Sequence, residues 1–211
     1  MENPVTLDVV LASASPRRRA LLEEAGVSFR VHAVDADESL EPDLAADPPE
    51  AAKKLAERKA HRAVEELLNG GYSGTMAVIA SDTMVVLDGR IFGKPRDADE
   101  ARAMLRDLSG RTHEVMTAVS LWMVHGPEGE DLALAYRTFL DATKVTFRPL
   151  DDVEIDAYIA TGDPFDKAGA YGIQSGGGAF VAAIDGALDT VIGLPVQRLL
   201  EEFPELRDGA L

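Results

Sequence analysis

Hydrophobic residues in this chain occur either as short unbroken runs or as stripes with helical spacing. Residues 9–12 (VVLA) and 76–80 (MAVIA) are unbroken apolar runs, which predict short buried strands. Residues 50–68 and 97–108 place apolar residues three and four positions apart, which predicts amphipathic helices. Ser15 and Pro16 suit a helix start and Gly26 suits its end. The chain therefore opens with a strand, a turn and a helix.

The middle of the chain predicts antiparallel strands. The runs MVVL and RIFGK flank Asp88-Gly89, a pair that is typical of a tight hairpin turn. Residues 112–124 and 134–148 predict two long strands around the loop GPEGED, and we expect them to pair with each other. Parallel-type and hairpin-type connections occur together, so the predicted class is α/β with a mixed, twisted sheet.

The last third of the chain predicts a helix, a glycine-rich loop, a strand and a final helix. The first helix opens at residues 150–152 and ends at residues 161–162, and the last runs from GLP at 193–195 to about residue 203. Between them, residues 162–178 contain six glycines. Because the strand-like AFVAAI follows directly, we interpret these residues as a functional loop or lid rather than a linker. Residues 35–49 are acidic, contain proline and predict another loop.

The composition is that of an ordinary globular protein. Of 211 residues, 46 % are hydrophobic and 27 % are charged, which suits one domain over residues 1–211. No apolar run approaches the ~18 residues that a membrane-spanning helix needs, and no signal peptide is visible. The sequence has no cysteine, which excludes disulfides and favours the cytoplasm. A net charge of −16 argues against nucleic-acid polymers and membranes as partners.

The first turn of the first predicted helix carries three arginines, Arg17, Arg18 and Arg19. Their sign is wrong for that position, because a helix N-terminus carries partial positive charge and favours acidic residues. The backbone N–H groups at a helix start have no partner within the helix and attract anions. Two planar guanidinium groups added there would form a strong anion site. We therefore favour an anion site for Arg17 and Arg18, whereas Arg19 suits a solvated position.

Asp82 lies within the apolar segment MAVIASDTMVVL. Burying an unpaired carboxylate costs several kcal/mol, so Asp82 should meet a cation or a metal ion. The alternative is that residues 81–83 end the strand and that Asp82 caps a turn. Lys59 is similarly out of place, because it shares one helix face with Ala52, Ala56 and Ala63. It either enters a site or extends its amine to water.

The pair Asp37-Glu38 offers the oxygen ligands that Mg²⁺ prefers, although most of the 37 carboxylates of this chain must simply be solvated. Lys94, with Arg96, follows the predicted hairpin and either reaches the same cleft or lies on the surface. Phosphate-binding and dinucleotide-binding glycine motifs are absent, as are zinc-type histidine spacings and a nucleophile elbow.

Seven blocks of the sequence resemble the Maf family of nucleoside triphosphate pyrophosphatases, from about residue 7 to 200. They are LASASPRR at 11–18, DADE at 35–38, AERKA at 56–60, ASDTMV at 80–85, FGKPRD at 92–97, LSGRTHEVMTAV at 108–119 and DKAGAYGIQ at 166–174. The last block is similar to the branch that hydrolyses dTTP and UTP, not to the 7-methyl-GTP branch.

The resemblance implies a fold, a reaction and partners. The fold is an elongated mixed sheet flanked by helices, as in Maf and ITPase-like proteins, with two lobes and a cleft between them. The reaction is NTP plus water giving NMP plus pyrophosphate, with a divalent cation such as Mg²⁺, Mn²⁺ or Co²⁺. The substrate is a nucleoside triphosphate, and a second copy of the chain is a candidate partner, since members of the family often dimerise.

The resemblance also implies roles for nine residues. Ser13, Arg17 and Arg18 would bind phosphates. The catalytic positions would be Glu38, Lys59, Asp82 and Lys94, with Asp82 as proton acceptor and with Glu38 and Asp82 as metal ligands. Arg17, Thr83 and Gln174 would select the base. Two alternatives stay open: a nucleotide-binding regulator of cell division without catalysis, and the same reaction on a modified nucleotide.

The sequence departs from the family pattern in two places. Ser175 stands where the family usually has glycine, directly after Gln174, and therefore bears on base selectivity. The segment DGALDTVIGLP matches only loosely before its last three residues.

Overall fold

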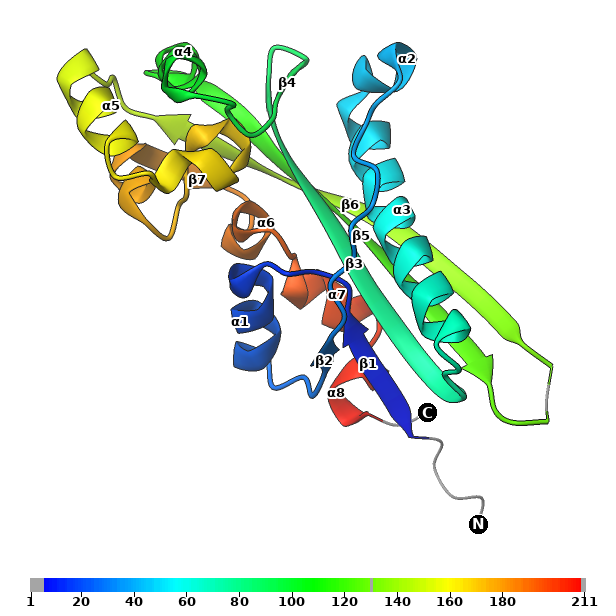
Figure 1. Ribbon diagram of the computed structural model, residues 1–211. Coiled ribbons are helices and arrows are strands. Elements are labelled where there is room, and N and C mark those ends of the chain that lie inside the picture. The colour runs from blue at the N-terminus through cyan, green and yellow to red at the C-terminus, as the bar shows by residue number, and fades with distance from the viewer. Residues whose placement is uncertain (1–5, 130, 210–211) are drawn as a thin grey trace.

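The computed structural model describes residues 6–129 and 131–209, in which seven strands form one mixed sheet (Figure 1). The strands follow the spatial order β2-β1-β3-β5-β6-β7, with β4 beside β3. β1 runs parallel to β2 and β3, and the other pairings are antiparallel. The strands are β1 Leu7–Leu11, β2 Arg30–Val31, β3 Gly74–Leu87, β4 Arg90–Phe92, β5 Thr112–Gly126, β6 Ala133–Phe147 and β7 Val181–Asp185. The predicted α/β class is confirmed.

The longer helices begin where a polar side chain caps the free N–H groups of the first turn. Ser15, Asp47, Asp97 and Asp151 each accept a hydrogen bond from the backbone N–H three residues further on. The helices are α1 Pro16–Glu24, α2 Pro42–Ala45, α3 Pro48–Asn69, α4 Ala98–Leu108, α5 Asp152–Ile159, α6 Leu188–Ile192, α7 Val196–Glu202 and α8 Glu205–Asp208. Three short 3₁₀ segments are η1 Asp163–Asp166, η2 Ala168–Ala170 and η3 Gly176–Phe180.

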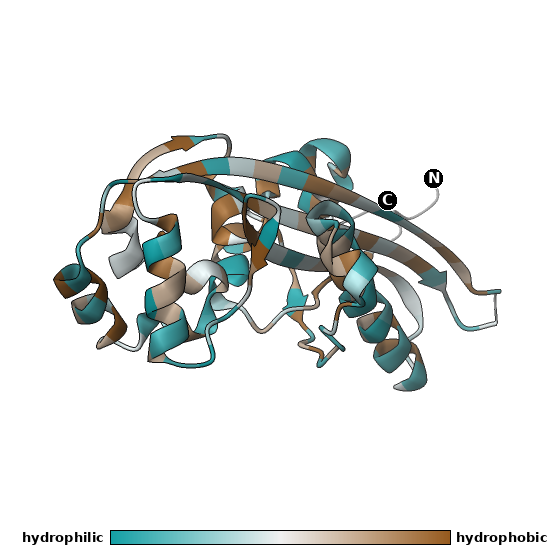
Figure 2. Cartoon of the chain, turned by 90° about the horizontal axis from the view of Figure 1, so that it is seen from above, coloured by the Kyte–Doolittle hydropathy of each residue, from teal (hydrophilic) through white to brown (hydrophobic). Residues whose placement is uncertain are grey.

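The alternation of side chains along β3 divides the core between the two faces of the sheet. Val78 and Met84 pack on the face that α3 covers. Ile79 packs on the opposite face against α1, α7 and α8, which we call the first lobe. Val85 lies on that same face, against α4, α5 and the 3₁₀ segments, which we call the second lobe. Figure 2 shows hydrophobic and hydrophilic residues alternating along the long strands.

Between the lobes, β3 has an open edge. β1 pairs with β3 only as far as Ile79, and pairing with β4 begins at Val85. In the described chain, no strand lies beside residues 80–84 on this side. Asp82 and Thr83 are successive residues in the gap, so their side chains leave opposite faces of the sheet yet reach the same opening.

One strand differs from the prediction in a way that matters for the site. The runs MAVIA and MVVL were expected as separate strands, but β3 is a continuous strand of 14 residues. Unbroken antiparallel pairing with β5 carries the polar residues Ser81, Asp82 and Thr83 through its middle. Asp82 therefore does not cap a turn at the end of a strand, and that alternative was wrong.

The predicted loops contain more structure than the sequence indicated. Residues 35–49 include α2, and the segment before GLP forms α6. The glycine-rich residues 162–178 fold into 3₁₀ turns whose Ala170 and Tyr171 are buried in the second lobe. Among the described residues, no helix has the length and apolarity needed to cross a membrane.

Candidate active site

A cleft of about 640 Å³ opens at the gap in β3, between the two lobes. Its walls come from the start of α1, the loop before α2, α3, β3, the residues after β4, and residues 166–174. All nine residues that the sequence singled out line this one cleft: Ser13, Arg17, Arg18, Glu38, Lys59, Asp82, Thr83, Lys94 and Gln174. The structure thus brings together residues that are up to 161 positions apart in the chain (174 − 13).

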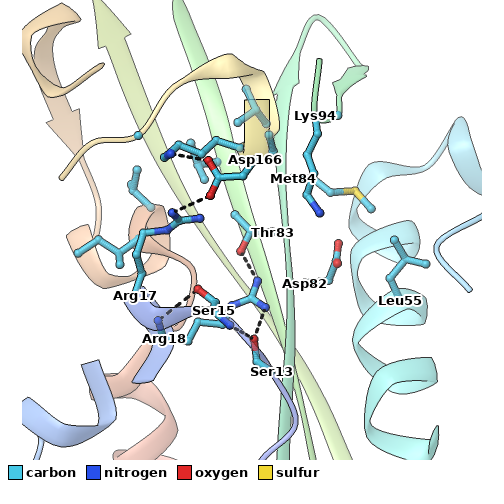
Figure 3. A pocket seen from close by; sticks show the side chains of 18 of the residues that line it. Ser13, Ser15, Arg17, Arg18, Leu55, Asp82, Thr83, Met84, Lys94 and Asp166 are labelled. Carbon is cyan, nitrogen blue, oxygen red and sulfur yellow. Dashed lines mark hydrogen bonds and ion pairs between the residues drawn. The ribbon is translucent and has the colours of Figure 1, made fainter. Parts of the chain in front are cut away.

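Three hydrogen bonds hold the Arg18 side chain, and Figure 3 shows the two that reach Ser13 and Thr83. Its Nε donates to the backbone carbonyl of Gly193 at 2.9 Å, Nη1 to Ser13 Oγ at 3.2 Å and Nη2 to Thr83 Oγ1 at 3.3 Å. Thr83 Oγ1 in turn lies 2.9 Å from Thr117 Oγ1 on β5. Burial lowers the pKa of Arg18, and nearby Asp82 opposes that shift; a guanidinium with so high an ordinary pKa stays charged. This side of the cleft presents a fixed cation.

Arg17 is held much more loosely. Its Nη1 makes one ion pair, with Asp166 Oδ2 at 3.4 Å, across the opening of the cleft. The two side chains are 33 % and 66 % exposed, so the pair is well solvated. Arg19 points elsewhere and pairs with Glu23 one turn along α1, which agrees with the solvated position expected for it. The two arginines of the cleft therefore differ in how firmly they are placed.

On the other side of β3, one lysine joins two carboxylates. Lys59 Nζ lies 2.6 Å from Asp82 Oδ1 and 2.7 Å from Glu38 Oε1. Asp82 and Lys59 are 10 % and 15 % exposed, whereas Glu38 is 52 % exposed. The amine of Lys59 therefore enters the site rather than extending to bulk water. Its charge stabilises the buried carboxylate, and the amine is a cation of the kind that the sequence predicted beside Asp82.

Glu38 is presented by a locally fixed turn. Asp37 accepts hydrogen bonds from the backbone and hydroxyl of Ser39, and Arg58 on α3 donates to the carbonyls of Asp37 and Ser39. The pKa of Glu38 lies below its ordinary value, chiefly because Lys59 donates a hydrogen bond to the carboxylate. Arg58 is a residue that sequence reasoning missed, and its place directly before Lys59 was the only available signal.

Lys94 lies at the rim of the cleft. Its Nζ is 4.0 Å from Glu38 Oε2 and its side chain is 61 % exposed. Arg96, considered with it as a second cation, turns away instead. Its backbone N–H and Nε bind Glu100 at 2.7 and 2.8 Å, which ties it to the first turn of α4. That part of the prediction was wrong, because a nearby helical carboxylate holds the guanidinium.

The glycine-rich segment supplies the far wall. Gln174 lines the cleft and is exposed. Ser175, the departure from the family pattern, donates to Asp163 Oδ2 at 2.6 Å and lies outside the cleft lining. Lys167 is only 11 % exposed and binds both Asp163 and Asp166. The hydroxyl of Ser175 is therefore engaged within its own segment rather than aimed at a ligand.

Tyr171 is a lining residue that the sequence did not single out. It is buried, and its hydroxyl lies 2.9 Å from Nε2 of the buried His113 on β5. Burial lowers the pKa of His113 to about 4, so this imidazole is neutral near pH 7. Burial also raises the pKa of Tyr171. Nothing in the sequence distinguishes Tyr171 from the other tyrosines, apart from its place in the block DKAGAYGIQ.

Two carboxylates are available for a divalent cation. Asp82 and Glu38 both face the amine of Lys59, and among residues 6–129 and 131–209 no third His, Cys, Asp or Glu completes a metal cluster. Mg²⁺ commonly takes one or two carboxylates and completes its shell with water and substrate phosphates. The two carboxylates therefore fit a cation whose remaining ligands come from water and a phosphate chain.

Comparison with known proteins gives consistent matches over most of the chain. The model of the family "Maf-like protein" matches residues 8–206. A dTTP/UTP pyrophosphatase of Anaeromyxobacter dehalogenans is 45 % identical over 89 % of this chain and 88 % of its own length. The dTTP/UTP pyrophosphatase of Desulfitobacterium hafniense is 47 % identical over 92 % and 83 %. A solved dITP/XTP pyrophosphatase of Mycobacterium abscessus is more distant, with 18 % identity and a TM-score of 0.39 over 95 % and 97 % of the two chains.

Proposed function

Because the chain belongs to the Maf-like family, we propose that it is a nucleoside triphosphate pyrophosphatase acting on dTTP and UTP. The reaction joins water to the α-phosphorus and releases NMP and pyrophosphate. One observation carries the proposal: a fixed arginine at a helix start lines the same cleft as an aspartate that is paired with a lysine. That pairing of an anion site with a proton acceptor is what hydrolysis of a triphosphate requires.

The phosphate chain would bind at the start of α1. Ser13, Arg17 and Arg18 line the cleft there, at the N-terminal end of α1, where the helix dipole is positive. Guanidinium groups match phosphate oxygens with two parallel hydrogen bonds. This answers why cations occupy a helix start that would otherwise favour acids: the ligand itself supplies the negative charge.

Asp82 would orient the attacking water and take its proton. Lys59 binds one of its oxygens, Oδ1, and so holds the group next to the open edge of β3. The same lysine, with Lys94 at the rim, adds positive charge that offsets the charge growing on the pyrophosphate leaving group. A positioned acid or base of this kind contributes about 10²–10⁴-fold to the rate.

A divalent cation bound to Glu38 and Asp82 would supply Lewis-acid polarisation of a phosphate oxygen. Both carboxylates are paired with Lys59 in this structure, so this amine and a cation compete for the same oxygens.

The base would lie against the glycine-rich wall. Gln174 offers an amide with both a donor and an acceptor, which suits the edge of a pyrimidine. Tyr171 and Thr83 line the adjoining surface. Ser175 uses its hydroxyl in a hydrogen bond to Asp163, so we do not assign it a role in selecting the base. That role stays with Gln174, Arg17 and Thr83. We further propose a cytoplasmic enzyme, on the absence of cysteine in 211 residues.

A product assay tests the proposal. The purified protein would be incubated with Mg²⁺, and then Mn²⁺ or Co²⁺, and with dTTP, UTP, CTP, dATP, GTP, ITP and 7-methyl-GTP. Pyrophosphate and orthophosphate would be measured separately. Pyrophosphate mainly from dTTP and UTP is the expected result. Pyrophosphate from another nucleotide would overturn the assignment of the base, and tight binding without any pyrophosphate would favour a regulator.

A further inference from the structure

The guanidinium of Arg18 is oriented by a carbonyl from the far end of the chain. Gly193, which is 175 positions away, follows α6 and accepts the hydrogen bond from Arg18 Nε at 2.9 Å. This is the shortest of the three hydrogen bonds that the Arg18 side chain donates. Gly193 opens the GLP triplet, which the sequence analysis used only as the start of the last helix, so this contact with Arg18 was not expected.

Counting donors shows what this contact achieves. A guanidinium has five N–H groups, one on Nε and two on each terminal nitrogen. Gly193 takes the Nε–H, while Ser13 and Thr83 each take one N–H from Nη1 and Nη2. One N–H therefore remains on each terminal nitrogen, and these two donors are available to phosphate oxygens. The Nε contact fixes the rotation of the plane in which that pair lies.

Position 193 requires glycine for two reasons. Its φ of +123° is a backbone conformation that residues with a side chain rarely adopt. A Cβ added there would also lie 3.2 Å from Thr83 Oγ1 and 3.3 Å from Arg18 Nε. A side chain at this position would thus press on the guanidinium of Arg18, which the Gly193 carbonyl orients.

The carbonyl of Gly193 is itself anchored to the sheet. Ser81 Oγ, buried on β3, donates to the same oxygen at 3.0 Å. In the preceding turn, Thr117 Oγ1 donates to the Thr190 carbonyl at 2.7 Å, and Thr190 Oγ1 donates to Asp141 at 2.5 Å. Hydrogen bonds to β3, β5 and β6 therefore hold α6 and Gly193 in place. The acceptor that orients Arg18 has little freedom to move.

We propose that Gly193 is a positioning residue for phosphate binding, acting through Arg18. Its carbonyl presets the guanidinium so that both free N–H groups meet the phosphate chain without reorientation. The inference rests on the proposed function in taking Arg18 as a phosphate ligand, and it adds a residue to which no role has been given.

The test compares Gly193→Ala with Gly74→Ala. Gly74 has a similar φ of +130°, but a Cβ there meets only ordinary contacts, the nearest being Tyr72 at 3.5 Å. The two variants share the backbone strain and differ in the contact with Arg18. Affinity for inorganic pyrophosphate would be measured by calorimetry, and KM and kcat for UTP would be measured separately. Gly193→Ala should weaken pyrophosphate binding and raise KM about tenfold, while Gly74→Ala should leave both within about twofold.

A double-mutant cycle with Arg18→Ala separates positioning from general damage. If Gly193 acts through Arg18, the Gly193→Ala change should have no further effect on pyrophosphate affinity in the Arg18→Ala background. Additive losses in a folded double variant would overturn the inference, as would a Gly193→Ala protein with unchanged affinity. If Gly193→Ala does not fold, Thr190→Val takes its place, because it loosens the same turn and should show the same coupling at smaller size.

The two proposals fail in different ways. A wild-type protein that binds pyrophosphate but releases none from any nucleotide would contradict the proposed function, and the cycle would still decide the role of Gly193. Additive losses in an active enzyme would contradict only the role of Gly193. A wild-type protein that binds no pyrophosphate would contradict Arg18 as a phosphate ligand and this inference with it.

Discussion

The two arginines at the start of α1 are adjacent in sequence and opposite in surroundings. Arg18 makes three hydrogen bonds to β3, the Ser13 loop and Gly193, whereas Arg17 makes one exposed ion pair with Asp166 of the second lobe. The first-lobe wall of the cleft is therefore built before a ligand arrives, and the second-lobe contact can be exchanged. Two arginines that line the same cleft can therefore differ in how firmly the protein holds them.

The same contrast divides the carboxylates. Asp82 is buried with Lys59 in the middle of a strand, while Glu38 stands on a turn and is half exposed. Fixed groups have lost their conformational entropy during folding, so they can serve chemistry without further ordering. Mobile groups suit contacts that must form and break in each turnover.

The largest effect is expected at the fixed carboxylate. Asp82→Asn keeps the shape but removes the proton acceptor, so kcat should fall about 10²–10⁴-fold. Pyrophosphate affinity should change much less, because Arg18 and Ser13 keep their contacts. Steady-state kinetics with calorimetry would check both, and a thermal melt would confirm folding. Lost affinity with an unchanged kcat would show that Asp82 binds substrate and performs no chemistry.

The buried side of the second lobe should respond to pH. In the folded protein the pKa of His113 is about 4, against 6.5 without burial, so between these values the unfolded chain binds more protons. Stability should therefore fall as pH drops from 6.5 towards 4, by up to about 3 kcal/mol from this residue.

Denaturant titrations at several pH values would measure that loss. His113→Phe should flatten the curve over this range, because no group remains at the position to titrate. His61→Gln, at an exposed position on α3, is the matched control and should leave the slope unchanged. An unchanged slope in His113→Phe would mean that another group controls acid stability.

The direct comparison of the two arginines comes next. Arg18→Ala should weaken pyrophosphate binding about 100-fold, because it removes a fixed charge with two free donors. Arg17→Ala should cost about tenfold or less, since an exposed pair with Asp166 has to be given up before Arg17 binds. Equal losses in the two variants would break the contrast on which this account depends.

The smallest effect is expected at Asp166. Asp166→Asn frees Arg17 and should tighten pyrophosphate binding by about twofold to threefold at low salt. The gain should shrink as salt is raised, because exposed pairs are screened. Calorimetry at two ionic strengths would measure it. Weaker binding in this variant would show that Asp166 orients Arg17 for the ligand instead of competing for it.

Sequence reasoning recovered most of the fold because local patterns carry it. The helix start at Ser15-Pro16, the hairpin turn and the apolar runs of the strands were all visible, since each depends on neighbouring residues. The continuity of β3 was not, because a polar triplet normally ends a strand and only pairing with β5 carries Ser81 to Thr83 through the sheet. Helix α6 was missed because its five residues are held by contacts to distant strands.

The residues of the candidate site also differ in whether the sequence alone could reveal them. Arg17, Arg18 and Asp82 stood out from the residues alone, because their charges conflict with their local setting. Glu38 and Lys94 required the family resemblance, since solvated carboxylates and lysines look the same in sequence. Gly193 acts through its backbone carbonyl, which every residue possesses, so no side-chain pattern could reveal it. Arg58 acts through its guanidinium, but its partners are the carbonyls of Asp37 and Ser39, which lie 21 and 19 positions away and leave no pattern in the sequence.

Hydrolysis of UTP in water labelled with heavy oxygen, with the products resolved by mass spectrometry, would show which phosphorus the water attacks. Attack at the α-phosphorus, with Asp82 activating the water, predicts that the label enters UMP and that the pyrophosphate stays unlabelled. Label in pyrophosphate, or release of orthophosphate as the first product, would contradict the account by placing the attack at another phosphorus.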